Sequence, residues 1–234
     1  MRRALIFAAG RGERLRPLTD STPKPLIEVG GKPLIVWHLE KLAAAGVREV
    51  VINTSHLAEQ FEPALGDGSR WGIAIRYSYE GPTPLETGGG MRRALDMFQA
   101  VVESEDNFIA VSADIWSDYD YANLSDVISG TAHLVMVPNP DFHPRGDFNL
   151  NGIRLNEEGI GERLTFANIG VYRRSFIDDQ PDGAFKLLPL FQRAMRKGDL
   201  SGERYDGHWH NIGNVAQMVA LNNELKTHTE KSGS

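Results

Sequence analysis

The most informative stretch of the chain is a short group of glycine and cationic residues that follows an apolar segment near its start. Its members are Ala9, Gly10, Arg11, Gly12, Arg14 and Lys24. Glycines let a backbone approach a bulky anion closely, and successive loop N–H groups form an anion-binding concavity. Arg14 and Lys24 add cationic donors, and each hydrogen bond to a charged group contributes about 1.5–3 kcal/mol. This combination predicts a site for the phosphates of a nucleoside triphosphate.

The glycine pair alone is a weak signal, because many turns between a strand and a helix contain glycine. The dinucleotide-binding fingerprint requires a third glycine three residues after Gly12, and Leu15 stands there. The P-loop pattern also fails, since no Gly-Lys-Ser/Thr follows. The longer string at 10–25, G-x-G-x-R-L-x-P-L-T-x-x-x-P-K-P, is far more specific than the glycines it contains.

This string resembles the signature of sugar-1-phosphate nucleotidyltransferases, which make nucleotide sugars from a nucleoside triphosphate and a sugar 1-phosphate. The resemblance implies that Arg14 and Lys24 are catalytic and that residues 9–12 bind the nucleotide. It also implies a magnesium-dependent enzyme with an α/β, Rossmann-like nucleotidyltransferase fold, in which helices flank a central, mostly parallel mixed sheet.

One carboxylate stands where a metal ligand is expected. Asp114 follows the apolar run at 108–113, and by itself such a residue is equally consistent with the start of a turn. Beside the first motif it resembles the family's catalytic, metal-binding aspartate, which holds Mg²⁺ against the nucleotide phosphates. Ser112, also expected at the nucleotide, stands where many relatives carry Asn. Mg²⁺ suits this role because it prefers oxygen ligands and shares its shell among carboxylates, phosphates and water.

A second family-like segment, residues 79–91, contains three consecutive glycines before an expected helix. Taken alone, it also fits a flexible loop in which Thr87 caps that helix. Glycines let a backbone lie against a flat base, and the N-terminal amides of a helix donate hydrogen bonds. The resemblance implies that Glu80, Thr87 and Gly88 bind the nucleotide near its base.

The expected sugar-binding residues lie in the second half of the chain. By resemblance, Gly146 and Asp147 form the turn that meets the sugar, and the Asp147 carboxylate binds sugar hydroxyls. Asn168 stands where relatives bring a small polar residue towards the sugar, and Lys186 belongs to a matched pattern at 185–190. Without the resemblance, the first two are an ordinary turn and Lys186 is a solvated side chain.

The chain departs from the family pattern at one metal position. Relatives commonly place Asp two residues before Gly213 as a second Mg²⁺ ligand, and this chain has Asn211. An amide oxygen still ligates a hard cation, but the substitution removes one negative charge from the site. Three interpretations stay open: Asp114 and the phosphates hold the metal, another residue compensates, or activity is attenuated.

Within the family, the sequence at 84–90 most resembles the branch that uses UTP and N-acetylmuramic acid 1-phosphate in peptidoglycan recycling. Shorter segments over much of the chain resemble the same branch. The resemblance therefore implies these two substrates, with a UDP-sugar and pyrophosphate as products. Two alternatives stay open. One is a guanylyl- or thymidylyltransferase for another hexose 1-phosphate, and the other is a catalytically attenuated regulatory protein that binds nucleotide sugars.

Apolar patterning predicts alternating strands and helices, which is typical of βαβ units and a parallel sheet. Strands are expected at 4–8, 50–53, 73–77, 108–112, 133–137, 148–155 and 166–173, and helices at 33–45, 57–65, 91–102, 124–128, 185–197 and 215–226. Ligands of such sheets bind beyond the carboxyl ends of the strands, where 10–14, Asn53, Glu80 and Asp114 fall. We expect one domain at 1–228, with a nucleotide-binding half at 1–130, a sugar-binding half at 131–228 and a flexible tail at 229–234.

Composition restricts the function further. A chain of 234 residues that is 41% hydrophobic supports one large core. A formal net charge of −6 argues against nucleic acid as a partner. The chain has no cysteine, which fits a cytoplasmic enzyme. The first apolar run is too short for a signal peptide or membrane span, so we expect no membrane partner. We also expect a monomer or weak dimer.

Overall fold

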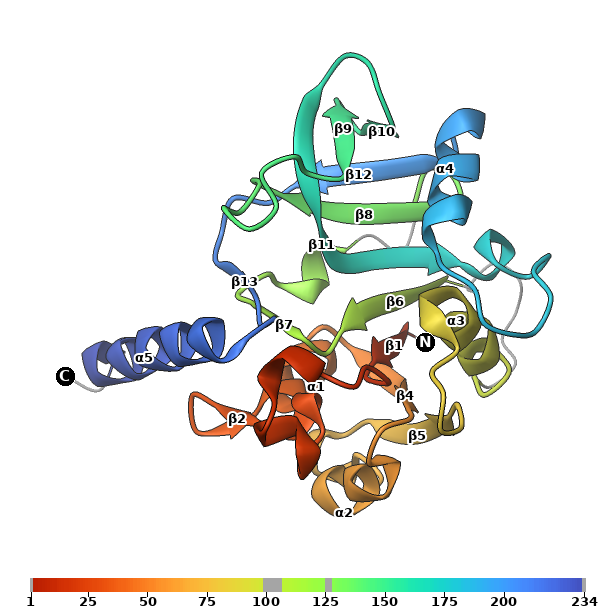
Figure 1. Cartoon of the computed structure of the whole chain (residues 1–234). Helices are drawn as coiled ribbons and strands as arrows, with labels where there is room; N and C mark the ends of the chain where they lie inside the picture. The colour runs from red at the N-terminus through yellow and green to blue at the C-terminus, as the bar shows by residue number, and fades with distance from the viewer. Residues whose placement is uncertain (1, 99–106, 125–127, 233–234) are drawn as a thin grey trace.

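A nine-stranded sheet forms the centre of the protein in a computed structural model that describes residues 2–98, 107–124 and 128–232 (Figure 1). Its strands in spatial order are β5 (Ala74–Tyr79), β4 (Val47–Thr54), β1 (Arg2–Phe7), β6 (Asn107–Ser112), β11 (Glu162–Arg173), β8 (Ala132–Val137), β12 (Leu200–Arg204), β10 (Arg154–Asn156) and β9 (Phe148–Asn151). The sheet continues from the first half of the chain into the second through the pairing of β6 with β11.

The two halves of the sheet differ in strand direction. In the first half β1 runs parallel to both β4 and β6, and β4 runs parallel to β5. In the second half β11 is antiparallel to β6, β8 and β9, and β9 and β10 form an antiparallel pair. Short turns connect β9, β10 and β11, and short turns join only antiparallel neighbours. The expected mixed sheet is confirmed: its first half is parallel throughout, and among the described pairings of the second half only β8 with β12 is parallel.

Helices cover both faces of this sheet. They are α1 (Leu34–Ala44), α2 (Phe61–Leu65), α3 (Glu86–Leu95), α4 (Leu188–Lys197) and α5 (Val215–Ser232). Successive side chains of a strand point to opposite faces, so Ala4 and Ile6 of β1 join a core cluster with α1 and α2. Leu5 joins a second cluster with α3 and α4. Of the helices described, none is long and apolar enough to cross a membrane.

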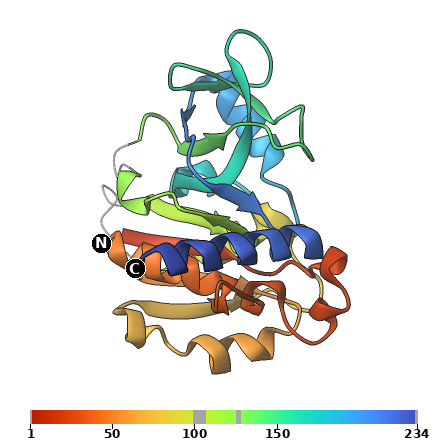
Figure 2. The ribbon, with the colours of Figure 1, turned by 90° about the vertical axis from the view of Figure 1, so that its left-hand side faces the viewer.

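A third, smaller cluster seats α5 on the side of the molecule (Figure 2). Leu221 and Leu225 of this helix pack against Val29 and Trp116. Two short strand pairs lie next to it: β2 (Glu28–Val29) with β3 (Lys32–Pro33), and β7 (Ile115–Ser117) with β13 (Trp209–Asn211). The helix continues to Ser232, past its predicted end at 226 and into the expected tail.

The helix predicted at 91–102 begins earlier and includes the three glycines. Thr87 therefore does not cap it, because α3 starts at Glu86 and Leu85 is its N-cap. The backbone N–H groups of Gly88 and Gly89 both donate to the Phe185 carbonyl oxygen, at 2.8 and 3.2 Å. A Cβ on Gly88 would lie 2.4 Å from the Phe185 ring, so this close approach requires glycine. The predicted residues beyond 98 lie outside the described part.

Other boundaries differ because turns were not visible in the apolar pattern. The helix predicted at 57–65 divides into a 3₁₀ turn, Ala58–Gln60, and α2. The strand predicted at 148–155 reverses at Gly152, which has φ +59°, and becomes the pair β9 and β10. Helix α4 starts after Lys186, and β12 was not predicted at all. Most of the helix expected at 124–128 lies outside the described residues.

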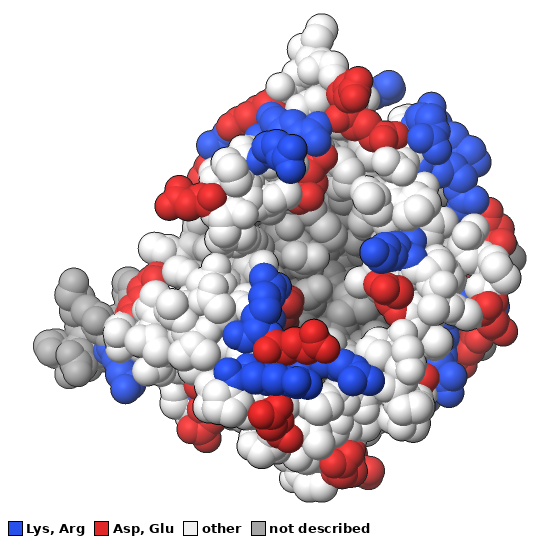
Figure 3. Space-filling view, viewed as in Figure 1, with Lys and Arg blue, Asp and Glu red and all other residues white. Residues whose placement is uncertain are grey.

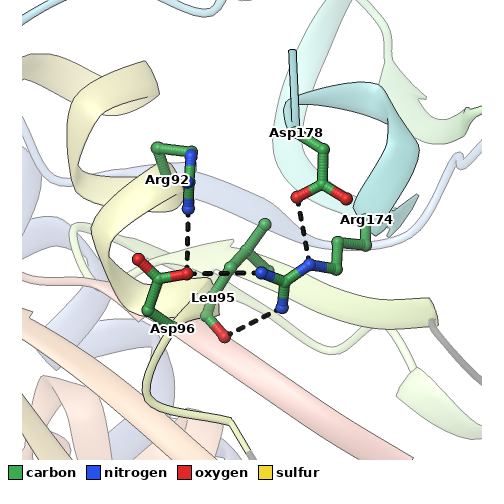
Figure 4. Close-up of polar contacts among 5 residues, drawn as sticks. All are labelled: Arg92, Leu95, Asp96, Arg174 and Asp178. Atoms are coloured by element: carbon green, nitrogen blue, oxygen red, sulfur yellow. Dashed lines mark hydrogen bonds and ion pairs between the residues drawn. The ribbon is translucent and has the colours of Figure 1, made fainter. Parts of the chain in front are cut away.

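An arginine joins the end of α3 to the 3₁₀ turn Arg174–Phe176 after β11 (Figure 4). The Arg174 guanidinium lies 3.2 Å from Asp96 and 3.0 Å from Asp178, and it donates to the Leu95 carbonyl oxygen at 3.3 Å. Asp96 also pairs with Arg92 at 2.9 Å. A cation at the C-terminus of a helix is favourable because carbonyl groups there lack partners. This cluster fixes α3, which carries part of the site, to the second half of the sheet.

Candidate functional site

A cavity of about 750 Å³ opens at the carboxyl ends of β1, β4, β5 and β6. Figure 3 shows a hollow on this face of the molecule, with cationic and acidic residues at its rim. Ten of the predicted site residues line the cavity: Ala9, Gly10, Arg11, Gly12, Arg14, Lys24, Glu80, Thr87, Ser112 and Asp114. The strand ends and the signature string therefore meet in one place.

The glycine loop folds tightly against the segment that carries Lys24. Gly12 has φ +62°, and a Cβ there would lie 2.9 Å from the Thr19 side chain and 3.1 Å from Lys24 Cβ. The Thr19 hydroxyl donates to the Gly12 carbonyl oxygen at 2.9 Å, and the Leu15 N–H donates to the same oxygen at 2.8 Å. Only glycine satisfies both the positive φ and the close contact. The loop thus brings the Lys24 ammonium to the cavity.

The two groups expected to act on phosphate and metal contact one another. Lys24 Nζ lies 2.9 Å from Asp114 Oδ2, with the Lys24 side chain only 10% exposed and the Asp114 side chain 43% exposed. Asp114 stands between β6 and β7, and its carbonyl oxygen accepts from the Ile212 N–H at 2.9 Å. The pair makes this corner of the cavity electrically balanced. The contact uses one oxygen of the carboxylate and one donor of the ammonium, so each group keeps capacity for a cation or a phosphate.

Two arginines complete the phosphate side of the cavity. Arg11 donates to the Pro82 carbonyl oxygen at 2.9 Å and so joins the glycine loop to the segment on the opposite wall. Arg14 lies beside the chain at Gly213, where a Cβ would be 3.3 Å from an Arg14 guanidinium nitrogen. Guanidinium groups present several N–H donors in a fixed plane, which suits phosphate oxygens.

A buried amide–carboxylate pair forms the opposite wall. Asn53 accepts from the Ala8 N–H at 2.6 Å and donates to Glu80 Oε1 at 2.6 Å, and Glu80 Oε2 accepts from the Leu85 N–H at 2.7 Å. Burial raises the pKa of Glu80. Both Glu80 carboxylate oxygens therefore accept hydrogen bonds from the protein, and these bonds fix the segment at 80–85. Asn53 was expected only as a residue at a strand end, and its role as a bridge was missed.

Thr87 lies at the junction of two cavities, and Gly88 lies outside both. The Thr87 hydroxyl oxygen accepts from the Leu187 N–H at 3.3 Å, while Gly88 is buried against Phe185 and does not line either cavity. The expectation that Gly88 meets the base is not supported by this placement. Glu86, which was missed, lines both cavities with a left-handed backbone of φ +61°, a strain that is typical of functional sites.

Most of the sugar-side residues line two further cavities, of which one adjoins the first cavity and the other adjoins the second. One, of about 220 Å³, shares Thr87 and Ser112 with the 750 Å³ cavity and is also lined by Asn168 and Lys186. The other, of about 430 Å³, again includes Asn168 and is lined by Asp147 and Asn211. Shared walls thus connect the expected nucleotide residues to the expected sugar residues in one series of cavities.

Asn168 reaches these cavities through an irregularity in β11. Its φ is +59°, and the pairing of β11 with β8 shifts register between Phe166 and Gly170. A bulge of this kind redirects a side chain. The Trp209 indole N–H donates to the Ala167 carbonyl oxygen at 2.9 Å, which holds the bulge from outside the sheet.

Asp147, which is expected to bind sugar hydroxyls, is hydrogen-bonded within the protein through both carboxylate oxygens. Its Oδ1 lies 3.1 Å from His143 Nε2, and its Oδ2 accepts from the Phe166 N–H at 2.8 Å. Gly146 has φ +56°, and a Cβ there would lie 2.4 Å from Asn139 Oδ1. Gly146 shapes the turn and lines none of the three cavities.

Asn211 lies on the strand next to Asp114 but lines a different cavity. In the pairing of β13 with β7, Asn211 stands opposite Ile115, and its side chain borders the 430 Å³ cavity. Around the described residues no group of three or more His, Cys, Asp or Glu side chains is arranged to hold a metal. Of the two expected ligands, only Asp114 faces the cavity of the glycine loop.

A protein-family model described as nucleotidyl transferase matches residues 3–144, which is more than half of the chain. The chain belongs to the nucleotidyl transferase family. Among solved structures, HddC from Yersinia pseudotuberculosis is similar with a TM-score of 0.76 and 22% identity, over 96% of this chain and 99% of that one. A Bacillus anthracis structure described as a glucose-1-phosphate thymidylyltransferase has a TM-score of 0.80 and 18% identity, over 96% and 95%. These likenesses confirm the predicted fold.

Curated relatives cover nearly the whole chain. An N-acetylmuramate alpha-1-phosphate uridylyltransferase of Neisseria meningitidis is 42% identical over 92% of this chain and 95% of its own length. A protein of the same name from Caulobacter vibrioides is 32% identical over 95% and 96%. A mannose-1-phosphate guanylyltransferase of Mycobacterium tuberculosis is 37% identical over 92% of this chain, but over only 62% of its own length.

Proposed function

We propose that the protein transfers a uridylyl group from UTP to N-acetylmuramic acid 1-phosphate, which yields UDP-N-acetylmuramic acid and pyrophosphate for cell-wall recycling. The names of the two relatives matched over more than 90% of both chains support these substrates. One structural observation supports nucleotidyl transfer itself. The glycine loop, Arg14, Lys24 and Asp114 line a single cavity that adjoins the expected sugar residues.

In this reaction an oxygen of the sugar phosphate attacks the α-phosphorus of UTP in line with the departing pyrophosphate. A phosphate monoester has a second pKa of about 6, so the nucleophile is already largely dianionic and needs no general base. The protein then contributes positioning and charge stabilisation. Arg14 and Lys24 neutralise phosphate oxygens, and the N–H groups of the glycine loop supply further donors.

Mg²⁺ fits this site as a cofactor, on the chemistry of the donors present. Asp114 offers a half-exposed carboxylate to the nucleotide cavity, and carboxylate oxygens with phosphates and water form the shell that Mg²⁺ prefers. Asn211 on the adjacent strand offers an amide oxygen. When bound, the ion would neutralise charge on the leaving pyrophosphate. Lys24 contacts only Oδ2 of the Asp114 carboxylate, and an ionised carboxylate has two accepting oxygens, so the ion and the ammonium would share it.

A second candidate is transfer of a guanylyl or thymidylyl group to another hexose 1-phosphate. The mannose-1-phosphate guanylyltransferase relative supports this alternative. The phosphate-binding loop does not distinguish one base from another, because it meets only the part that all nucleoside triphosphates share.

One assay separates these candidates. Pyrophosphate release is measured over a panel of nucleoside triphosphates and sugar 1-phosphates, with Mg²⁺ present. We expect the highest kcat/KM for UTP with N-acetylmuramic acid 1-phosphate. Preference for GTP or dTTP with another sugar would support the second candidate. Tight binding of UTP or UDP-sugar without pyrophosphate release, with Mg²⁺ or Mn²⁺, would instead identify an attenuated regulatory protein.

A further inference from the structure

A histidine and an aspartate form a bonded pair on the wall of the 430 Å³ cavity. His143 and Asp147 both line it, with side chains 39% and 36% exposed. An ionised carboxylate only accepts hydrogen bonds, so the 3.1 Å contact identifies His143 Nε2 as the donor. This arrangement fixes the ring and leaves Nδ1 available for a further contact.

The loop that carries the pair is held rigidly against β11. The Asp147 N–H donates to the Leu164 carbonyl oxygen at 2.7 Å, and Asp147 Oδ2 accepts from the Phe166 N–H at 2.8 Å. Asn139 adds two bonds, because its amide donates to the Arg163 carbonyl oxygen and its Oδ1 accepts from the Thr165 hydroxyl, both at 2.9 Å. A group held in this way needs no rearrangement to meet a ligand, so less ordering entropy is lost on binding.

Few of the residues that line this cavity can carry a charge. Its described lining consists of Phe142, His143, Asp147, Phe148, Thr165, Phe166, Asn168, Leu188, Phe191, Trp209 and Asn211. In that set His143 is the one side chain that can carry a positive charge, and Asp147 is the one carboxylate. The aromatic and amide walls suit a sugar ring, but they do not distinguish an acidic sugar from a neutral one.

We propose that His143 is the specificity-determining residue of the sugar side, an inference that rests on the proposed function. Its imidazole contacts the carboxylate of the ether substituent that distinguishes N-acetylmuramic acid from a neutral N-acetylhexosamine. Asp147 is a positioning residue, which acts by orienting His143. In the complex the ring lies between two carboxylates and donates one hydrogen bond to each, from Nε2 to Asp147 and from Nδ1 to the substrate.

Among the sugar-binding residues expected from the sequence, Lys186 is the cation that competes for this role. It lines the 220 Å³ cavity together with Glu86, Thr87 and Ser112, which also border the nucleotide cavity. That position places it towards the reacting phosphates rather than at the far end of the sugar. His143 lines only the outer cavity, where a substituent remote from the phosphate would lie.

The test compares two sugar phosphates that differ only in the acidic ether: N-acetylmuramic acid 1-phosphate and N-acetylglucosamine 1-phosphate, each with UTP. For His143→Gln we expect kcat/KM for the acidic sugar to fall about 10- to 100-fold, the loss expected for one charge-assisted hydrogen bond. The neutral sugar should change less than about twofold, and KM for UTP should stay at the wild-type value. His208→Gln makes the same chemical change outside the three cavities and should leave both sugars unaffected.

Two outcomes overturn the assignment of His143: an equal loss for both sugars, or no loss for either. If the wild-type protein does not use N-acetylmuramic acid 1-phosphate at all, the proposed function fails first and this inference fails with it. The positioning role has its own test. Asp147→Asn should reduce selectivity less than His143→Gln, and the double variant should be no worse than His143→Gln alone. Additive losses would show that Asp147 contacts the sugar independently.

Discussion

The nucleotide-side cavity and the sugar-side cavities are built in different ways. The first collects residues from the ends of parallel strands and from one continuous motif. Its charged groups have partners within the protein: Lys24 forms an ion pair with Asp114, and Glu80 accepts a hydrogen bond from Asn53. The sugar side collects residues from segments far apart in the chain, with aromatic walls and few charges. The nucleotide side thus presents paired charged groups, which suit a highly charged ligand. The sugar side selects by shape and by single polar contacts.

The largest effects should come from breaking the ion pair on the nucleotide side. Asp114→Ala and Lys24→Ala are each expected to lower kcat by about 10²–10³-fold, the scale for loss of one electrostatic stabiliser. Circular dichroism should show an intact fold, and Lys32→Ala, a charge removal on the β2–β3 hairpin, should retain activity. Near-wild-type turnover of either site variant at saturating Mg²⁺ would remove that residue from the catalytic group.

The contrast between the two regions also explains which features of the site could be predicted from the sequence. The signature string and the strand ends placed ten site residues in one cavity, because parallel strands end at the same edge and the motif is continuous in sequence. The pairing of Lys24 with Asp114 was not predicted, since their separation in sequence hides a contact that only the folded loop creates.

On the sugar side the residues were identified, but their contacts were not. Asp147 was predicted to bind sugar hydroxyls, but its two bonds within the protein were not predicted. His143 was missed, although it stands four positions before Asp147 in a turn-rich segment. Gly88 was assigned to the base because glycines permit close approach, but the group that approaches is Phe185. Partners that come from distant segments depend on tertiary structure, which local patterns do not encode.

A buried histidine, His38, lies against β7 and should make the stability of the protein sensitive to acid. His38 Nε2 donates to the Ile115 carbonyl oxygen at 2.8 Å, next to Asp114, and Nδ1 accepts from the Tyr121 hydroxyl at 2.7 Å. Burial lowers the pKa of His38 from 6.5 to about 4. Between these pH values the His38 side chain is protonated in the unfolded chain but not in the native protein. The free energy of unfolding therefore falls as pH drops from about 6.5 to about 4, by on the order of 3 kcal/mol.

Urea unfolding at pH 7.5 and pH 4.5 checks this expectation. His38→Gln lacks the titrating group, so its free energy of unfolding should decrease less between the two pH values than that of the wild type. Other titrating groups contribute equally to both proteins and cancel in the comparison. Equal decreases would show that His38 is not the source of acid sensitivity.

Glu80 tests whether the opposite wall binds substrate or performs chemistry. Glu80→Ala removes the bonds to Asn53 and the Leu85 N–H, which loosens the segment at 80–85. We expect KM for UTP to rise about tenfold with kcat largely kept, because this wall contributes similarly to the ground state and the transition state. Glu59→Ala, which removes an exposed carboxylate outside the cavity, serves as the control. A collapse of kcat with unchanged UTP affinity would place Glu80 in contact with the reacting groups.

The smallest effect concerns Asn211, which lies between the two regions: its strand is bonded to that of Asp114, while its side chain borders the sugar cavity. If the side chain turns towards the metal in the substrate complex, Asn211→Asp should lower the Mg²⁺ concentration for half-maximal pyrophosphate release. The change should be modest, on the order of two- to fivefold, because phosphates and Asp114 already supply anionic oxygens. Asn214→Asp adds the same charge three residues away, where Asn214 caps α5 through the Gln217 N–H, and should leave the Mg²⁺ requirement unchanged. An identical Mg²⁺ dependence in both variants and the wild type would assign Asn211 to the sugar side alone, and the metal would then be held by Asp114 and the nucleotide.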